Sequence, residues 1–181
     1  MRIIAGHHRG VRLASVGKGD AAAHLRPTPD RVRESLFNVL NAWLDWDGAR
    51  VLDLFAGTGA LGLEALSRGA EHVSFVENGR VGHKLISENI AKLRCEDDVQ
   101  VFKQDATRLG TAPTPCDLVF LDPPYGKGLG PYALASARDG GWLASGALIV
   151  WEENAPQEAP EGFTLAERRR YGDTHLTFLT V

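Results

Sequence analysis

The chain has 181 residues, and 20 Lys and Arg side chains against 23 Asp and Glu give it a formal net charge of −3. This length fits one domain that buries a real core, and 44% hydrophobic with 24% charged residues is ordinary globular composition, which excludes a disordered or fibrous chain. The sequence has no apolar run near the roughly 20 residues of a membrane helix, no secretory signal, and only two cysteines, too few for a disulfide framework. We therefore expect a soluble, cytoplasmic protein.

Positive charge is concentrated at the start of the chain. Residues 1–33, here called the basic arm, carry a net charge of +5, whereas the rest of the chain carries −8. A basic N-terminal arm is typical of proteins that neutralise nucleic-acid phosphates, but chance clustering on a solvated loop gives the same composition. Charge alone leaves both interpretations open.

The first part of the chain predicts a hairpin followed by a helix. Arg2–Ala5 and Val11–Ala14 are short candidate strands joined by a glycine-containing turn, and we expect the following segment, residues 15–24, to be mobile. Thr28 is the expected N-cap of the helix, with Pro29 at its first position. The helix then carries an apolar stripe made of Val32, Leu36, Val39, Leu40 and Trp43.

After Gly48 the pattern alternates between strand and helix. The expected strands are Arg50–Phe55, Glu71–Val76, Val99–Phe102, Asp117–Leu121, Ala147–Trp151, Phe163–Arg170 and Thr174–Val181, with helices at Ala60–Arg68 and Gly82–Arg94. The short turn between the last two strands forces them to pair antiparallel. The predicted fold class is α/β: a Rossmann-like, doubly wound, mostly parallel sheet with an antiparallel C-terminal edge strand. We expect a basic N-terminal appendage made of the hairpin and helix (residues 1–45) and a main domain (residues 46–181).

A glycine-rich turn follows the first strand of the main domain. Gly57, Gly59 and Gly62 fit the pattern G-x-G-x-x-G, and Glu77 lies 20 residues beyond Gly57, where an acid that binds ribose hydroxyls is expected. This pattern predicts a cofactor with a nucleoside part, and by itself it also fits a dinucleotide.

Asp53 separates the two kinds of cofactor. A carboxylate one turn from the glycines would oppose a pyrophosphate bound at the helix N-terminus, whereas it would attract the ammonium and sulfonium groups of S-adenosylmethionine. Asp53 therefore favours the methyl donor. Asp105 follows a later strand and is placed to bind an adenine amine, although a turn cap explains this residue nearly as well.

The tetrapeptide Asp122-Pro123-Pro124-Tyr125 follows a buried strand, at the edge where open α/β sheets bind their ligands. The two prolines hold the chain rigid, so that the Asp122 carboxylate and the Pro123 carbonyl can both accept hydrogen bonds from one exocyclic NH2 group. Tyr125 offers a face on which a planar base can stack. A rigid loop that merely closes the sheet is the alternative explanation.

Several sequence segments carry a family resemblance, among them the tail Arg169–Thr174. Asp122-Pro123-Pro124-Tyr125 looks like the catalytic motif of amino methyltransferases that act on adenine N6, cytosine N4 or guanine N2. The stretch from Asp53 to Ala70, together with Met1–Gly6 and Leu25–Glu34, is more particular and resembles the bacterial 16S ribosomal RNA guanine-N2 methyltransferases specific for guanine 966. The resemblance spans nearly the whole chain. It implies a class I methyltransferase fold, S-adenosylmethionine as cofactor, and a small-subunit RNA substrate carried with ribosomal proteins in a 30S precursor.

The expected site residues follow from these motifs and the resemblance. The catalytic group is Asp122, Pro123, Pro124 and Tyr125. The cofactor site is expected to contain Asp53, Phe55, Ala56, Gly57, Thr58, Gly59, Glu77, Asn78, Asp105, Ala106 and Asp122. RNA is expected to contact Arg9, Arg12, Arg26, Thr28, Arg31, Arg33 and Lys127. The six histidines show no ligand spacing, so no metal site is expected. We also expect a monomer.

Several alternatives stay open at this point. The base could be adenine or cytosine, which also carry an exocyclic amine, and the RNA substrate could be free or in a particle. A nicotinamide-dependent oxidoreductase and a non-catalytic RNA-binding factor are the competing functions. The basic arm could also serve only to complete the fold; if it instead binds RNA, deletion of residues 1–24 should leave a folded protein.

Overall fold

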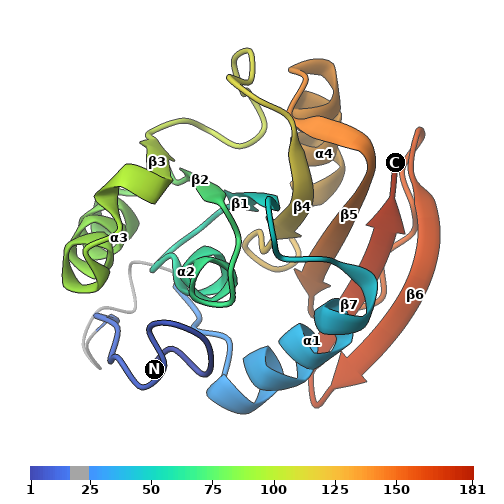
Figure 1. Cartoon of the computed structure of the whole chain (residues 1–181). Helices are drawn as coiled ribbons and strands as arrows, with labels where there is room; N and C mark the ends of the chain where they lie inside the picture. The colour runs from blue at the N-terminus through green and yellow to red at the C-terminus, as the bar shows by residue number, and fades with distance from the viewer. Residues whose placement is uncertain (17–24) are drawn as a thin grey trace.

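The computed structural model describes residues 1–16 and 25–181 (Figure 1). Its helices are α1 (Asp30–Trp43), α2 (Ala60–Ser67), α3 (Arg80–Leu93) and α4 (Gly130–Asp139). Its strands are β1 (Arg50–Leu54), β2 (His72–Val76), β3 (Val99–Phe102), β4 (Cys116–Leu121), β5 (Leu143–Glu153), β6 (Thr164–Tyr171) and β7 (Thr174–Thr180). The segment expected to be mobile falls mostly outside the described residues. Within the described part, no helix is long and apolar enough to cross a membrane.

The seven strands form one sheet in the order β3-β2-β1-β4-β5-β7-β6. The five strands from β1 to β5 pair in parallel, and β7 pairs antiparallel with both β5 and β6. The strand order reverses between β1 and β4, which makes the carboxyl ends of these two strands the topological switch point of the sheet. This topology confirms the predicted α/β, mostly parallel sheet with an antiparallel C-terminal part.

Helices cover both faces of the sheet because successive strand residues point to opposite sides. One hydrophobic cluster joins Val51, Phe75 and Phe120 to apolar residues of α1, α2 and α3. A second cluster joins Leu52 and Val119 to α4 and to the segment that follows it. Figure 1 shows the resulting layers, with the sheet between α1, α2 and α3 on one side and α4 on the other.

The N-terminal segment packs into the same core as the sheet. Ile3 and Leu13 are buried in the cluster that contains α1, α2 and α3. The backbone N–H groups of Ile4 and Ala5 donate to the carboxylate of Glu64 on α2, at 2.8 and 3.1 Å. These contacts make the segment part of the fold and weigh against the expectation that residues 1–24 can be deleted without loss of folding.

The structure corrects several local predictions. The two expected N-terminal strands reduce to one antiparallel bridge, between Arg2 and Arg12. Thr28 is not the N-cap of α1; Pro29 takes that position and gives no side-chain cap, while the Thr28 hydroxyl donates to Glu152 at 3.0 Å. The helix α4 was not predicted at all. The remaining elements occur where the sequence predicts them, with ends that differ by a few residues.

Candidate active site

The site lies where the parallel strands end. Backbone hydrogen bonds continue past the strand ends: the N–H of Ala56 donates to the Val76 carbonyl at 3.1 Å, and the N–H of Asp122 donates to the Leu54 carbonyl at 3.5 Å. The residues that follow β1, β2 and β4 therefore lie side by side at the switch point, where open α/β sheets bind their ligands. The glycine turn after β1, Glu77 after β2 and the Asp-Pro-Pro-Tyr tetrapeptide after β4 therefore meet at this edge.

The turn after β1 has an unusual backbone. Phe55, Gly57 and Gly59 all have positive φ values, of 57°, 58° and 78°. Glycine adopts this conformation at no steric cost, but for Phe55 it costs on the order of 1–3 kcal/mol. Such strain persists where the surrounding structure enforces it, and it clusters at ligand sites. Ala56 and Thr58 complete this turn, and the Thr58 carbonyl accepts a hydrogen bond from the Asn89 side chain at 2.9 Å.

Glu77 ties the glycine turn to the end of β2. One carboxylate oxygen accepts a hydrogen bond from the Gly57 N–H at 2.8 Å, and the other accepts one from the Gly79 N–H at 2.7 Å. Glu77 is buried, whereas the neighbouring Asn78 is exposed. A carboxylate therefore already occupies a backbone amide that a dinucleotide site would direct at its pyrophosphate.

Asp53 lies beneath the same turn. Its side chain is 1% exposed, and its Oδ2 accepts a hydrogen bond from the Gly62 N–H at 2.9 Å. Burial is the main cause that raises the pKa of Asp53 to about 8, the Gly62 hydrogen bond opposes this, and the charge of Glu77 adds to it. A nearby positive group would favour the ionised carboxylate, and a negative group would not.

Asp105 forms a turn cap in this structure. It is exposed, and one of its oxygens accepts hydrogen bonds from the backbone N–H and the hydroxyl of Thr107, at 2.9 and 2.7 Å. These two hydrogen bonds lower the pKa of Asp105, and the bond from the backbone N–H of Thr107 has the larger effect. The alternative explanation given by the sequence, a turn cap, therefore holds here. Ala106, four residues after the end of β3, is buried in the hydrophobic cluster that contains Leu54 and Val76.

The Asp-Pro-Pro-Tyr tetrapeptide leaves β4 at the switch point. Burial, followed by the charge of Glu152, raises the pKa of Asp122 well above its ordinary value. Pro123 is buried, whereas Pro124 is exposed and Tyr125 is half-buried. The Tyr125 hydroxyl donates to Glu152 at 3.0 Å, which fixes the orientation of its ring.

Glu152 and Glu153 are site residues that the sequence analysis missed. Both are 6% exposed at the end of β5, next to the end of β4. Glu152 accepts the Tyr125 hydroxyl, and Glu153 accepts the backbone N–H of Gly126 at 3.3 Å, so both hold the loop that carries the tetrapeptide. The available signal was a pair of acids that directly follows the buried run Leu148–Trp151.

The residues expected to contact RNA differ in their exposure, and two of them are buried. Arg9, Arg12, Arg26, Arg31 and Lys127 all lie at the surface. Arg33 is fully buried: it donates to the Arg2 carbonyl and forms an ion pair with Asp30 at 2.9 Å. Arg33 therefore has no group to offer to RNA, and Thr28, 8% exposed and bonded to Glu152, is equally withdrawn.

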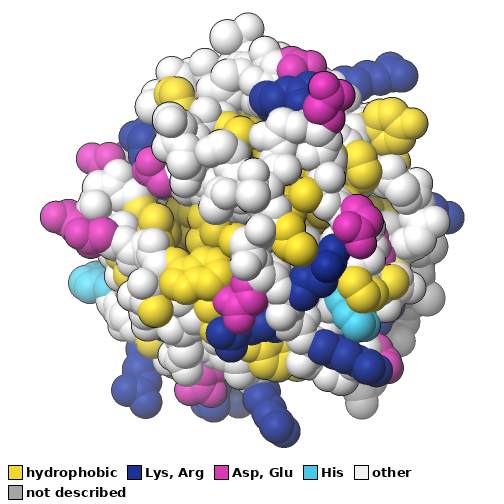
Figure 2. All heavy atoms as spheres, turned by 90° about the vertical axis from the view of Figure 1, so that its right-hand side faces the viewer, with side chains coloured by type: hydrophobic (Ala, Val, Ile, Leu, Met, Phe, Trp, Pro, Cys, Tyr) yellow, Lys and Arg dark blue, Asp and Glu magenta, His cyan; other side chains and the backbone are white. Residues whose placement is uncertain are grey.

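Arg26 lies against the tetrapeptide. Its guanidinium carbon is 4.4 Å from the centroid of the Tyr125 ring, which is a cation–π distance. Other basic side chains are more dispersed: Figure 2 shows that Lys and Arg alternate with Asp and Glu on the face around the β6 edge. There Arg168 pairs with Glu158 at 3.0 Å and Arg169 with Glu167 at 2.8 Å.

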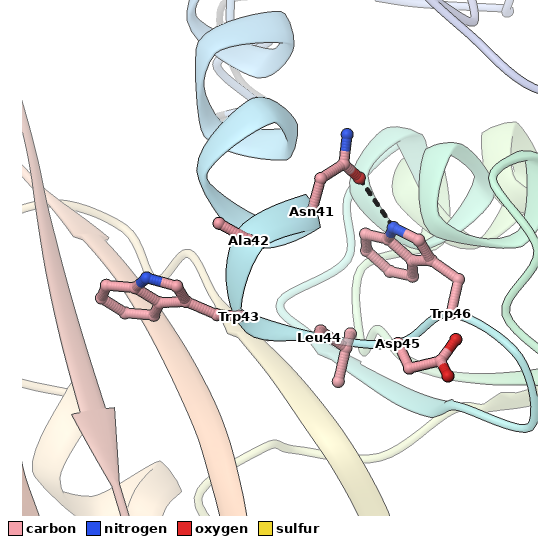
Figure 3. Close-up of a pocket in the computed structure, with 6 residues that line it drawn as sticks. All are labelled: Asn41, Ala42, Trp43, Leu44, Asp45 and Trp46. Carbon is pink, nitrogen blue, oxygen red and sulfur yellow. Dashed lines mark hydrogen bonds between the residues drawn. The ribbon is translucent and has the colours of Figure 1, made fainter.

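A separate hollow of about 600 Å³ lies beyond the end of α1 (Figure 3). Its lining, Asn41–Trp46, comes from one continuous stretch before β1, so it is at the amino ends of the parallel strands and apart from the site. The indole N–H of Trp46 donates to Asn41 Oδ1 at 2.8 Å, and Trp43 packs edge-on against Phe178 with 5.1 Å between the ring centroids. Both tryptophans pack against neighbouring side chains, although Trp43 is 42% exposed, whereas the thiols Cys95 and Cys116 are buried.

The strand-end arrangement suits a ligand that is cationic and rich in hydroxyl groups. The acceptors brought together are carboxylates, and two of them already occupy amides of the glycine turn and its helix. A pyrophosphate would face these carboxylates, whereas ammonium, sulfonium and ribose hydroxyl groups would be attracted by them. The site therefore fits S-adenosylmethionine better than a dinucleotide. Among residues 1–16 and 25–181, no cluster of His, Cys, Asp and Glu is suited to a metal ion.

Comparisons with known proteins show similarity along nearly the whole chain. The family model described as "Conserved hypothetical protein 95" matches residues 1–180. The chain is 38% identical over 175 residues to the Ribosomal RNA small subunit methyltransferase D of Escherichia coli K12. The aligned region covers 95% of this chain and 85% of that protein. It is 36% identical over 178 residues to the protein of the same name from Haemophilus influenzae, covering 95% and 89%.

Two solved structures show the same fold. The yhhF protein of Escherichia coli superimposes with a TM-score of 0.82 at 36% identity, covering 99% of this chain and 97% of that one. A SAM-dependent methyltransferase of Aquifex aeolicus gives a TM-score of 0.63 at 15% identity, covering 84% and 93%. The second comparison concerns the fold alone.

Proposed function

Because the chain belongs to the family of the ribosomal RNA small subunit methyltransferases D, we propose that it methylates the exocyclic N2 of a guanine in small-subunit ribosomal RNA. Methylation of ribosomal RNA is supported by the relatives of this chain, and the guanine N2 atom as the target is our more specific proposal. The single observation that supports this target class best is the position of Asp122 and Pro123 at the switch point, beside the glycine turn.

The cofactor is S-adenosylmethionine, which supplies an electrophilic methyl group on its sulfonium when bound. In our proposal Asp53, Phe55, Gly57 and Gly59 line its methionine part, together with Ala56 and Thr58. Glu77 and Asn78 lie toward the ribose, and Asp105 and Ala106 toward the adenine. The carboxylates at β1 and β2 support this assignment, because they attract cations and accept hydroxyl hydrogen bonds.

Asp122 and the Pro123 carbonyl orient the amine of the target base. The lone pair of an aromatic amine is delocalised into the ring, so the group is a weak nucleophile. Two fixed acceptors would each accept a hydrogen bond from one of its hydrogens and leave the lone pair facing the methyl group. When the nitrogen forms its bond to the methyl carbon, the carbon–sulfur bond would break, and the nitrogen would then release one proton to water. Catalysis is then mainly positioning with charge placement, and Pro124 holds the loop that presents the stacking face of Tyr125.

The substrate in this proposal is a 30S precursor that already carries ribosomal proteins, and the enzyme works as a monomer in the cytoplasm. The exposed basic side chains of Arg9, Arg12, Arg26, Arg31 and Lys127 provide the phosphate contacts. The −8 charge of the chain outside the basic arm would otherwise repel RNA.

Mass spectrometry of ribosomal RNA tests this function. The gene is deleted, the strain is complemented with the wild-type chain or with Asp122→Ala, and each small-subunit nucleotide is examined. We expect one N2-methylguanine to disappear on deletion, to return with the wild type, and to stay absent with Asp122→Ala. Calorimetry with S-adenosylhomocysteine is the control, since this variant should change cofactor affinity little.

The result also separates the alternatives. Loss of an N6-methyladenine in place of N2-methylguanine would correct the target and keep the class of reaction. Full methylation by Asp122→Ala would remove the proposed catalytic group. Isolated 30S particles and free 16S RNA from the deletion strain, each incubated with enzyme and labelled methyl donor, show which one is the substrate.

A further inference from the structure

Glu152 bonds to two segments that are far apart in the sequence. Its Oε2 accepts a hydrogen bond from the Thr28 hydroxyl at 3.0 Å, and its Oε1 accepts one from the Tyr125 hydroxyl at 3.0 Å. Glu152 itself is buried at the end of β5, a position fixed by pairing with β4 and β7. One carboxylate on the sheet thus connects the basic arm to the Asp-Pro-Pro-Tyr loop.

The two connected segments each have a role in the proposed function. Tyr125 presents the face on which the target base stacks, and Thr28 follows Arg26 by two residues. Arg26 also covers the Tyr125 ring, with its guanidinium carbon 4.4 Å from the ring centroid. The ring is therefore fixed at its hydroxyl by Glu152 and contacted on one face by Arg26 of the basic arm, so that the base would stack on the opposite face.

A carboxylate is chemically suited to this connection. Burial raises the pKa of Glu152, whereas the hydrogen bonds from Tyr125 and Thr28 and the charge of Arg26 favour its ionised form. As a carboxylate it only accepts hydrogen bonds, so both hydroxyls must point toward it and their orientations are determined. Hydrogen bonds to a charged acceptor are stronger than those between neutral groups. Glu153 adds support by accepting the Gly126 N–H, which holds the chain just after Tyr125.

We propose that Glu152 is a positioning residue for methyl transfer, which holds the stacking ring of Tyr125 and the RNA-contacting segment around Arg26 in one fixed arrangement. This inference rests on the proposed function. Glu152 touches neither substrate nor cofactor in it, and acts only through Tyr125 and Thr28. Binding of RNA by the basic arm and placement of the base are then coupled through one side chain.

A double-mutant cycle tests the proposal. Glu152→Gln keeps the side-chain shape but leaves only one oxygen to accept hydrogen bonds, and Tyr125→Phe removes the hydroxyl while the ring remains. With 30S particles from the deletion strain, we expect each variant to lower kcat about ten- to hundredfold, the range that small misplacements produce. The double variant should lose no more than the worse single variant, because both substitutions remove the same interaction.

Other variants isolate the second bond and serve as controls. Thr28→Val loses only the contact on the side of the arm, so it should raise KM for the particle more than it lowers kcat. Tyr132→Phe on α4, where the side chain is 69% exposed, and Glu161→Gln on the surface are the matched controls and should behave as the wild type. Affinity for S-adenosylhomocysteine, measured by calorimetry, should stay within about twofold in all of them.

The opposing results are distinct. Additive losses in the cycle, or wild-type turnover by Glu152→Gln, would overturn the proposal. So would a loss of cofactor affinity and thermal stability in step with activity, because Glu152 would then be merely structural. The same double-mutant cycle is also measured on equilibrium binding of the 30S particle. If the wild type shows no turnover, the proposed function is rejected. Non-additive losses of binding affinity in the cycle would still show whether Glu152 and Tyr125 act together.

Discussion

The carboxyl group of Asp53 is almost completely removed from water and has one backbone hydrogen bond to replace its hydration. Burial is the largest reason for its pKa of about 8, against an ordinary value of 3.8. The folded protein therefore binds a proton at Asp53 far more tightly than the unfolded chain does. Folding stability must fall as the pH rises through the interval between these two values.

This linkage gives a prediction for Asp53→Asn. The wild type should lose up to about 1.4 kcal/mol of unfolding free energy per pH unit from this group between about pH 4 and pH 8. Asparagine is neutral at every pH and its oxygen can still accept the Gly62 N–H, so the variant should show a shallower decline. The variant should still lose some stability as the pH rises, because Asp122 and Glu152 also have raised pKa values. Urea unfolding at pH 5, 6, 7 and 8 measures the unfolding free energy of both proteins. Identical slopes of this free energy against pH would contradict the raised pKa of Asp53.

The predictability of single residues depended on how local their contacts are. The glycine turn and the Asp-Pro-Pro-Tyr tetrapeptide were predicted because each is a short pattern with its own chemistry. Glu152 was missed because its partners are 27 and 124 residues away. Arg33 was misassigned for the same reason, since its charge suggested a surface role and only the fold brings Glu64 to it, with 3.9 Å between Arg33 Nε and Glu64 Oε2.

Close approach of α2 to the sheet depends on Gly62. A Cβ atom at this position would lie 2.7 Å from Val73 Cγ1 and closer still to the Phe75 ring, both on β2. The third glycine of the predicted pattern therefore serves helix packing. Gly62 also carries the N–H that Asp53 accepts, so its position affects the carboxyl group beneath the turn.

We expect Gly62→Ala to lower the unfolding free energy by about 1–3 kcal/mol, the usual cost of an added methyl group in a packed core. Gly110→Ala is the control, because a Cβ there would meet no heavy atom within 4 Å and the backbone is not in the left-handed region. Urea unfolding at one pH compares both with the wild type. Equal stability of the two variants would show that α2 shifts without cost.

Elements were predictable where their apolar pattern was strong. The strands β1 and β4 are apolar runs apart from Arg50, Asp53 and Asp117, and α1 has a clear apolar stripe. The helix α4 escaped prediction because it begins with Gly130-Pro131 and buries mainly small residues, Ala133 and Ala137 beside Leu134. Small side chains give little periodic signal, although they let α4 pack closely on the sheet.

At the scale of the molecule, the basic arm is both a charged surface and a part of the core. Its apolar residues Ile3 and Leu13 are 1% and 6% exposed. Its backbone also satisfies buried polar groups of the main domain: Ala14 exchanges hydrogen bonds with Asn89 of α3, at 2.6 and 3.1 Å. The distribution of charge along the sequence predicts the charged surface. The packing into the core could not be predicted, because it depends on contacts between residues that are 59 to 75 positions apart.

Deletion of residues 1–14 should therefore destabilise the whole protein. The truncation exposes the core surface that Ile3 and Leu13 cover, where a single large-to-small change costs about 2–5 kcal/mol. It also removes the Ile4 and Ala5 N–H groups from the Glu64 carboxylate and the Ala14 backbone from the Asn89 amide, which keeps only its bond to the Thr58 carbonyl. Hydrogen bonds that buried groups cannot make add to the loss of stability. We expect the truncated chain to unfold at lower urea concentration or to be unfolded in buffer, as measured by circular dichroism.

The double variant Arg9→Ala, Arg12→Ala separates the charge of the arm from its packing. Both side chains are exposed, so the free energy of unfolding should stay within about 0.5 kcal/mol of the wild type. Affinity for 30S particles should fall, and each lost phosphate contact should make the dependence of log affinity on log salt less steep by somewhat under one. A stable truncated chain, or unchanged salt dependence in the double variant, would contradict this division of roles.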